Sequence, residues 1–245
     1  MEERIRKRKI VLVGTGFVGM SFAYSLLSEK GINELVLIDM NKDKAVGEQM
    51  DLSDGLPYAD SKMTIKAGEY EECGDADIVV ITAGAAQKPG QTRLELVGIN
   101  ARITKDVATQ VKNSGFKGIL VVASNPVDIM TYVAYKASGL PKEHVIGSGT
   151  ILDTARLRYN ISKRLGMAPS NVHAYILGEH GDSSFVPWIH CYLGCKNLLE
   201  YIDEEDNLTL EDLQNIYLEV RNAAYEIIDR KKATYYGIGL ALKRL

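Results

Sequence analysis

The sequence has few cysteines and little net charge, and each shortage argues against a class of protein. Its 245 residues include three cysteines and six prolines, and the formal net charge is −3. Three cysteines offer no regular disulfide framework, and Cys191 and Cys195 lack the second Cys or His pair of a structural zinc site. We therefore expect reduced thiols and no bound metal. The small charge gives no electrostatic reason to expect nucleic acid or an anionic membrane as partner.

Long apolar runs are also missing. No stretch approaches the roughly 18 apolar residues that a membrane-spanning helix needs. The apolar run that follows the basic start is interrupted by Gly14 and Gly16, which does not suit a signal peptide. We expect a cytoplasmic protein with no membrane partner.

Short apolar runs alternate with longer segments of helical spacing over the first part of the chain. Strand-like runs lie at residues 9–13, 34–39, 63–67, 77–83 and 118–123, and helical segments at 17–29, 43–54 and 94–113. Continuous apolar runs suit strands that are buried on both faces. The alternation therefore predicts a doubly wound α/β sheet of parallel strands over residues 1–148.

The pattern becomes less regular from residue 149. A helical segment at 151–165 is followed by extended segments at 172–177 and 185–193 and by a second helical segment at 209–230. This part predicts a separate α+β domain over residues 149–245.

A glycine-rich turn follows the first predicted strand and opens the first predicted helix. Gly14, Gly16 and Gly19 have the spacing G-x-G-x-x-G, and Asp39 ends the second strand 20 residues after Gly19. The glycines permit a tight turn, a close approach of a pyrophosphate and close packing of helix on strand. A carboxylate at Asp39 accepts hydrogen bonds from ribose hydroxyls and repels a 2′-phosphate. The sequence therefore predicts a Rossmann-type domain that binds NAD in preference to NADP.

Ionisable and amide side chains lie next to the ends of several predicted elements. Asn125 follows a strand, Asp153 and Arg156 share one face of a helix, and His180 lies in the segment GEHGD. Arg93 ends the polar segment QKPGQTR. Each of these has an ordinary structural explanation by itself, but their joint occurrence beside a dinucleotide fingerprint indicates an active site.

The motifs GTGFVG, ITAGAAQKPGQTRLELV, VVASNPVDIMTY, GTILDTARLR, HAYILGEHGDSSFVPW and RNAAYEIIDRKKATYYGIG resemble those of the L-lactate/L-malate dehydrogenase family. The resemblance extends over essentially the whole chain. It implies NAD-dependent hydride transfer between a 2-oxo acid and an L-2-hydroxy acid.

The resemblance also implies roles for individual residues. His180 would be the general acid/base, oriented by Asp153, and Arg156 would bind the substrate carboxylate through a two-pronged contact. Arg93 would polarise the substrate carbonyl, and Asn125 would hold it near the histidine. The full substrate set is Gln87, Arg93, Asn125, Arg156 and Thr234. The cofactor set is Gly14, Gly16, Phe17, Val18, Gly19, Asp39, Ala83, Gly84, Asn125 and Ile238.

Gln87 indicates which acid is used. The malate branch of the family carries arginine at this position, where it pairs with a second carboxylate, and a neutral glutamine would leave that charge buried and unpaired. We therefore favour pyruvate and lactate over oxaloacetate and malate. A malate dehydrogenase and a non-enzymatic NAD-binding remnant stay as alternatives.

The resemblance carries two further implications. Arg158 and His173 match positions that bind fructose 1,6-bisphosphate in allosteric members, and members form homo-oligomers, either tetramers or dimers. Full-length members continue beyond the position of Leu245, so we expect the second domain to be incomplete at its C-terminus, with apolar surface exposed on the strands after Val172.

Overall fold

The computed structural model describes residues 8–85, 92–202 and 208–245, which divide into two compact units. The first unit contains residues 1–148 and Tyr235–Leu245, and the second contains Gly149–Thr234. The division at residue 148 lies where the sequence pattern changes. The last eleven residues, however, pack with the first unit, so a single cut of the chain at residue 149 does not describe the two units.

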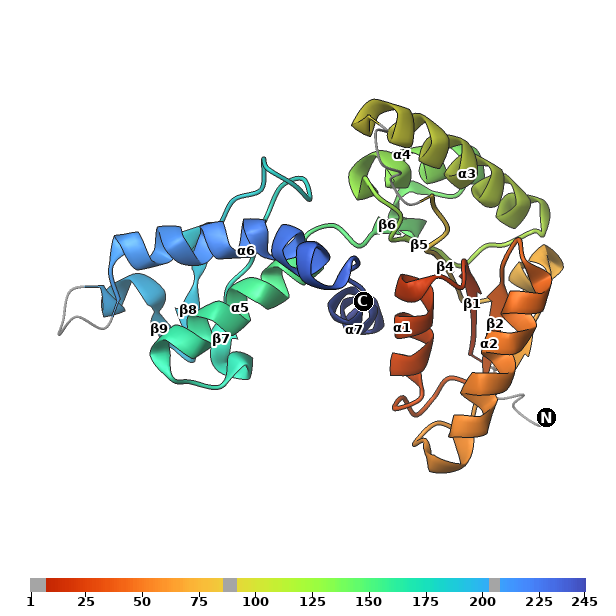
Figure 1. The fold of residues 1–245 in the computed structure, drawn as a ribbon, viewed down its shortest axis with the longest axis horizontal. Coiled ribbons are helices and arrows are strands. Elements are labelled where there is room, and N and C mark those ends of the chain that lie inside the picture. The colour runs from red at the N-terminus through yellow and green to blue at the C-terminus, as the bar shows by residue number, and fades with distance from the viewer. Residues whose placement is uncertain (1–7, 86–91, 203–207) are drawn as a thin grey trace. The chain divides into compact units, whose positions relative to one another are not determined.

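The first unit is built on a six-stranded parallel sheet (Figure 1). Its strand order is β3-β2-β1-β4-β5-β6, with the reversal between β1 and β4. The strands are β1 (Lys9–Val13), β2 (Glu34–Ile38), β3 (Thr64–Ala67), β4 (Ile78–Ile81), β5 (Ile119–Val122) and β6 (Val145–Gly147). The helices are α1 (Phe17–Leu26), α2 (Lys42–Gly55), α3 (Arg93–Asn113), α4 (Val127–Ser138) and α7 (Tyr236–Arg244). This arrangement confirms the predicted doubly wound fold.

Alternate residues of the strands contribute to two hydrophobic cores, one on each face of the sheet. Val11 and Val79 face the core that α3 and α4 cover. Leu12 and Val80 face the core that α1, α2 and α7 cover. Both faces are therefore buried along the central strands, which is why these strands have continuous apolar sequences rather than alternating ones.

Helix α7 packs closely against α1 within the first unit. A side chain on Gly239 would come within 2.7 Å of the backbone of Ser21, so only glycine permits this approach. Lys243 donates to Ser28 at 2.7 Å and pairs with Glu29 at 2.7 Å, which fixes the other end of the contact.

The second unit has two helices and a small antiparallel sheet. Helices α5 (Ile151–Leu165) and α6 (Leu210–Lys231) enclose a core with the strands β7 (Val172–His173), β8 (Tyr192–Leu193) and β9 (Lys196–Asn197). Large apolar side chains of its extended segments are exposed, among them Tyr175, Leu177, Phe185 and Ile189.

The predicted strands of the second unit are much shorter in the structure than the sequence indicated. Side chains of α5 and of its N-cap residue Thr150 replace a neighbouring strand over residues 174–176. Thr154 accepts from the Ile176 amide at 3.0 Å, and Thr150 donates to the Ile176 carbonyl at 2.6 Å. Regular pairing resumes only at the single bridge between Leu177 and Phe185.

Candidate functional site

The turn after β1 has the geometry that its glycines predict. Gly14 has a φ of 104°, and a side chain there would come within 2.6 Å of the Ala83 amide nitrogen. A side chain on Gly19 would come within 2.1 Å of the Gly14 carbonyl oxygen. Around Gly16, by contrast, nothing lies within 4 Å of the position of a Cβ atom. Two glycines therefore allow close packing, and the third leaves open space beside the backbone.

Helix α1 begins at this turn without a side-chain cap. Its N-cap is Gly16, and its first turn contains no acidic residue. The first amides of the helix point out of its N-terminus, and the helix dipole adds a partial positive charge there. Such an end is suited to a phosphate group.

Asp39 lies directly after β2 and beside the same turn. One of its carboxylate oxygens accepts from the amide and hydroxyl of Thr15, both at 2.8 Å, and the other accepts from the Asn41 amide at 3.0 Å. Burial opposes the ionisation of Asp39, but these hydrogen bonds and the charge of Lys44 outweigh it and hold the pKa below its ordinary value. Asp39 is thus a fixed carboxylate at the end of β2.

The loops after β4 and β5 are tied together beside the point where the strand order reverses. Asn100 of α3 accepts from the Ala85 amide at 2.8 Å and donates to the Asn125 carbonyl at 2.8 Å. Ser124 donates to the Ala83 carbonyl at 2.6 Å. Ala83 and Gly84 lie in the first loop, and the exposed Asn125 lies in the second. Ligands of doubly wound sheets bind at such a switch point. The sequence analysis missed Asn100, although an asparagine inside a helix is a signal that could have been noticed.

The remaining predicted cofactor residues lie on α1 and α7. Phe17 is 71% exposed and stacks on Tyr235, with ring centroids 5.1 Å apart. Val18 and Ile238 are half-buried against the core between the sheet and these helices. The structure therefore gathers the glycine turn, Asp39 and the two strand-end loops at one edge of the sheet, with Phe17 at the start of α1.

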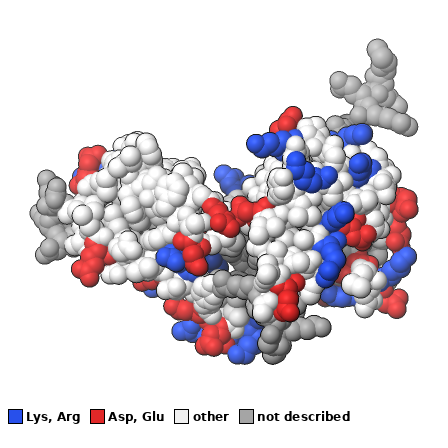
Figure 2. Space-filling model, turned by 90° about the horizontal axis from the view of Figure 1, so that it is seen from above, with Lys and Arg blue, Asp and Glu red and all other residues white. Residues whose placement is uncertain are grey.

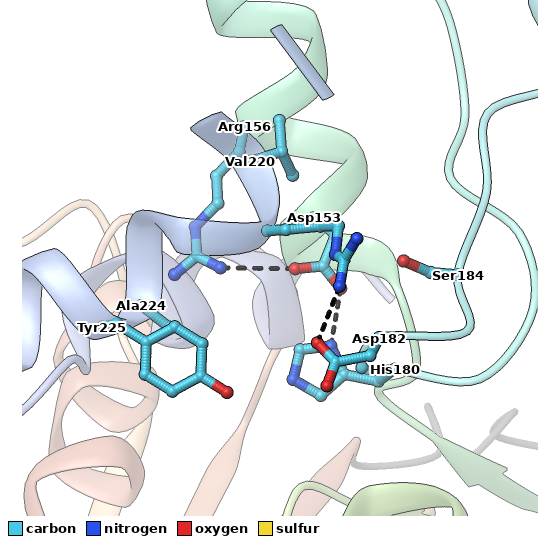
Figure 3. Close-up of a pocket in the computed structure, with 10 residues that line it drawn as sticks. Asp153, Arg156, His180, Asp182, Ser184, Val220, Ala224 and Tyr225 are labelled. Atoms are coloured by element: carbon cyan, nitrogen blue, oxygen red, sulfur yellow. Dashed lines mark hydrogen bonds and ion pairs between the residues drawn. The ribbon is translucent and has the colours of Figure 1, made fainter. Parts of the chain in front are cut away.

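A pocket of about 110 Å³ lies in the second unit and contains three of the predicted catalytic and substrate residues (Figure 3). Asp153 lies between the other two. One of its oxygens contacts Nδ1 of His180 at 2.6 Å, and the other accepts from Arg156 at 3.3 Å. A single carboxylate therefore orients an imidazole and a guanidinium at the same time.

The pocket is partly removed from solvent. The side chain of Asp153 is 11% exposed, that of Arg156 is 14% exposed and that of His180 is 31% exposed. Burial lowers the pKa of Arg156 from its ordinary value, and Asp153 opposes this effect. The guanidinium nevertheless stays charged, because arginine is not deprotonated in proteins. The pocket thus holds a permanent cation beside the contact between His180 and Asp153.

One wall of the pocket comes from α6, which the sequence analysis did not assign to the site. Val220, Arg221, Ala224 and Tyr225 line it, together with Ser184 of the preceding loop. Positions 220, 221, 224 and 225 lie on one face of a helix. That periodicity was visible in the sequence, but it also fits simple packing on a core.

Several predicted substrate residues are not placed in the pocket. Gln87 lies outside the described residues, and Arg93 is placed only as the first residue of α3. Thr234 is half-buried at the end of the second unit and is not among the residues that line the pocket.

The two predicted effector residues lie near each other along α5 and β7. Arg158 donates to the carbonyl of Ala174, the residue after His173, at 2.9 Å. Its guanidinium lies 4.7 Å from the centre of the Tyr175 ring. His173 is exposed on β7.

Other kinds of site find no support in the part of the chain that the structure describes. These residues include no group of three or more His, Cys, Asp and Glu side chains that could hold a metal ion. None of the described helices is long and apolar enough to cross a membrane. Figure 2 shows basic and acidic side chains interspersed on the surface that it presents, in agreement with the small net charge.

The first unit has a Rossmann-type sheet with a glycine turn and a carboxylate after β2. The second, smaller unit has a pocket lined by ionisable side chains. Together these features define the class of two-domain NAD-dependent dehydrogenases. The sequence matches the lactate/malate dehydrogenase NAD-binding domain over residues 8–147 and the α/β C-terminal domain of the same family over residues 150–245. The chain belongs to the lactate/malate dehydrogenase family.

Individual relatives agree with this assignment. The chain is 54% identical to an L-lactate dehydrogenase of Lactococcus lactis subsp. cremoris (strain NZ9000), over 99% of this chain and 77% of that protein. The crystal structure of a lactate dehydrogenase from a Medee basin deep-sea metagenome library is 58% identical, with a TM-score of 0.94 over 98% of this chain and 76% of the other. The ligand-bound minor L-lactate dehydrogenase of Enterococcus mundtii is 53% identical, with a TM-score of 0.95 over the same shares.

Proposed function

We propose that the chain catalyses the NAD-dependent interconversion of pyruvate and L-lactate. The observation that carries this proposal is the Asp153 carboxylate, which contacts His180 at 2.6 Å and Arg156 at 3.3 Å within one pocket. The names of the Lactococcus and Enterococcus relatives support lactate as the acid.

Each side chain has a role that its chemistry suits. Asp153 accepts the Nδ1 proton of His180 and favours the imidazolium, which leaves Nε2 to exchange a proton with the substrate oxygen. Arg156 binds the substrate carboxylate through its planar fork. Bound NADH supplies the hydride. A cationic histidine then stabilises the negative charge that develops on the oxygen and delivers the proton to it.

The other assigned residues complete the proposal. Gly14, Gly16 and Gly19, with the first amides of α1, bind the pyrophosphate, and Asp39 binds the ribose. Arg93 polarises the carbonyl, Asn125 positions it, and Thr234 and Ile238 line the substrate and nicotinamide pocket. The neutral Gln87 favours a substrate with one carboxylate over a dicarboxylate.

An absorbance assay of NADH oxidation tests this function. We expect the purified chain to reduce pyruvate faster than oxaloacetate, and His180→Asn to lose the activity. Gln87→Arg should shift preference toward oxaloacetate. A strong oxaloacetate preference of the wild type would overturn the choice of acid. NADH binding without reduction of either acid would favour a non-enzymatic NAD-binding module.

We also propose that fructose 1,6-bisphosphate regulates the protein through Arg158 and His173. A guanidinium and an imidazole on neighbouring elements form a suitable grip for a phosphate group. Activity titrations with the sugar bisphosphate in the wild type and in Arg158→Gln test the idea. We expect the sugar bisphosphate to activate the wild type but not Arg158→Gln. An identical lack of response in the two proteins would contradict the proposed regulation.

A homo-oligomer, either a dimer or a tetramer, is the proposed assembly. The first unit exposes Phe17, Tyr24, Tyr58, Tyr236 and Leu240, each more than half accessible, around one apolar groove. Contiguous exposed apolar surface is typical of an interface between proteins. Sedimentation velocity of the wild type and of Tyr58→Asp tests this. Dissociation of the variant is expected, and a monomeric wild type would contradict the proposal.

A further inference from the structure

The loop that carries His180 is closed at its base by a pair of backbone hydrogen bonds. The Leu177 amide donates to the Phe185 carbonyl at 2.9 Å, and the Phe185 amide donates to the Leu177 carbonyl at 3.0 Å. We call the segment between them, residues 178–184, the histidine loop. Gly178 and Gly181 have φ values of 94° and 154°, so its shape depends on glycine and not on regular secondary structure. Its base alone therefore leaves several backbone torsions to be fixed by other contacts.

Helix α6 supplies two of the contacts that hold the loop. Arg221 donates to the Asp182 carboxylate at 3.2 Å, and the Tyr217 hydroxyl donates to the Ser184 carbonyl. Tyr217 and Arg221 are four residues apart, so they lie on the same face of α6. The Arg221 guanidinium also lies 5.8 Å from the centre of the Tyr217 ring. The loop is thus attached to α6 at two points, one of them two residues after His180.

The energetics of the Arg221 contact do not suit a role in fold stability alone. The side chain of Asp182 is 73% exposed and that of Arg221 is 34% exposed, and exposed ion pairs contribute little to stability. The Nε atom of Arg221 is buried and has no hydrogen-bond partner among the described residues. A buried donor without an acceptor is destabilising. The ion pair alone therefore does not explain an arginine at this position, whose guanidinium contacts Asp182 of the loop and the Tyr217 ring.

We propose that Arg221 is a positioning residue that holds the histidine loop and thereby keeps His180 against Asp153. The proposal builds on the acid/base role given above to His180. Arg221 lines the same pocket as His180 and Arg156, but its charge is directed to Asp182. The ionisable residues that line this pocket are Asp153 and Arg156 of α5, His180 and Asp182 of the loop, and Arg221 and Tyr225 of α6. Catalysis is sensitive to this placement, because a displacement of about 1 Å can cost roughly 100-fold in rate.

Arg221→Met tests the proposal, with Arg230→Met as the matched control. Arg230 lies on the same helix, pairs with Glu226 at 3.3 Å and is 70% exposed. We expect Arg221→Met to lower kcat for pyruvate about tenfold, with KM and NADH affinity changed less than about twofold. Arg221→Lys should restore part of kcat, because it keeps the charge but not the planar fork. The control should leave kcat unchanged.

A second measurement does not depend on turnover. The proton between His180 Nδ1 and Asp153 should give a downfield 1H NMR signal, which we expect to broaden or disappear in Arg221→Met and to persist in Arg230→Met. If the wild type reduces no 2-oxo acid, the proposed function fails, while this signal still decides whether Arg221 positions His180.

Asp182→Asn removes the same ion pair from its exposed end, so it must reproduce the losses of kcat and of the NMR signal even if Arg221→Met does not fold. An unchanged signal and unchanged kcat in Asp182→Asn or in a folded Arg221→Met would overturn the proposal. A raised KM with unchanged kcat would also overturn it, because it would indicate that Arg221 contacts the substrate.

Discussion

Strand β1 of the first unit has five buried residues and pairs in register with β2 on one side and β4 on the other. Strand β7 of the second unit has two residues and pairs with β8 alone in the described sheet. Beyond β7, the backbone relies on the side chains of Thr150, Thr154 and Arg158. The first unit therefore places its site on a regular backbone framework, to which Asp39 and Asn100 add side chains, whereas the second unit builds its site from individual side chains. Substitutions should act differently in the two units.

The largest effect is expected at Asp153 in the second unit. Asp153→Asn replaces an acceptor by a group that cannot stabilise an imidazolium, so we expect kcat for pyruvate to fall about 10²–10⁴-fold. NADH affinity should not change, because the glycine turn belongs to the other unit. Stopped-flow binding and steady-state assays separate the two quantities, with the exposed Asp229→Asn as control. A parallel loss of NADH affinity would show that the units are not separable in this way.

In the first unit, Gly14→Ala should damage the backbone itself. Its φ of 104° and the 2.6 Å approach to Ala83 leave no room for a side chain, so we expect a loss of about 2 kcal/mol or more in the free energy of unfolding. Gly16→Ala is the matched control, since the space around it is open. It should fold normally but bind NADH at least about tenfold more weakly, because the methyl group occupies the approach of the pyrophosphate. Urea denaturation measures the free energy of unfolding of each variant, and calorimetric titration measures its affinity for NADH. Equal destabilisation by the two substitutions would argue against this distinction.

A side-chain network also stabilises the first unit, at the end of β1 away from the glycine turn. Lys9 is 7% exposed and contacts Glu72 and Asp75, each at 2.6 Å. Lys9→Met should lower the free energy of unfolding by about 1–3 kcal/mol, less than for a fully buried pair because Asp75 is exposed. The exposed Lys105→Met serves as control.

The same network predicts the pH dependence of stability. The contact with Lys9 holds the pKa values of Glu72 and Asp75 below their ordinary values, and the pKa of Lys9 is raised although burial opposes this. The two carboxylates therefore contribute to the free energy of unfolding above about pH 4. They lose this contribution as the pH falls through their pKa values in the folded state. Lys9 contributes fully below about pH 10 and loses its contribution only as the pH rises through its own folded value. In the wild type, the free energy of unfolding measured by urea titration should decrease as the pH falls below about 4, and Lys9→Met should make this decrease smaller. An unchanged decrease in Lys9→Met would contradict this account.

The smallest effect is expected at Asp39. Asp39→Asn removes the charge that repels a 2′-phosphate, and we expect the NADPH-to-NADH ratio of kcat/KM to rise about tenfold, or roughly 1.4 kcal/mol. Because the pKa of Asp39 lies below its ordinary value and the second pKa of a 2′-phosphate is about 6, both charges are constant above about pH 7, so the coenzyme preference of the wild type should stay constant from about pH 7 to 8. A preference that changes over this range would indicate another discriminating group.

The same contrast explains what could be predicted from the sequence. Continuous apolar runs specify strands buried on both faces, so β1 was predicted to the residue, and β2 to β5 and α3 to within two residues. The glycine turn, Asp39 and the grouping of Asp153, Arg156 and His180 followed from local motifs. Arg221 and Asn100 were missed because each acts on a segment distant in the chain, and a single sequence does not show such contacts. The extended segments of the second unit were overpredicted because their apolar residues pack without neighbouring strands.

The return of α7 to the first unit has a consequence for how the molecule assembles. The contact between Ser25 and Gly239 joins positions 214 residues apart. During synthesis the ribosome must complete the entire second unit before α7 can cover α1. The apolar side of α1 that α7 covers therefore stays exposed until the end of the chain has been made. Pairings between such distant positions form slowly, since much chain entropy is lost first. The first unit is therefore the earlier of the two to begin folding and the later to be finished.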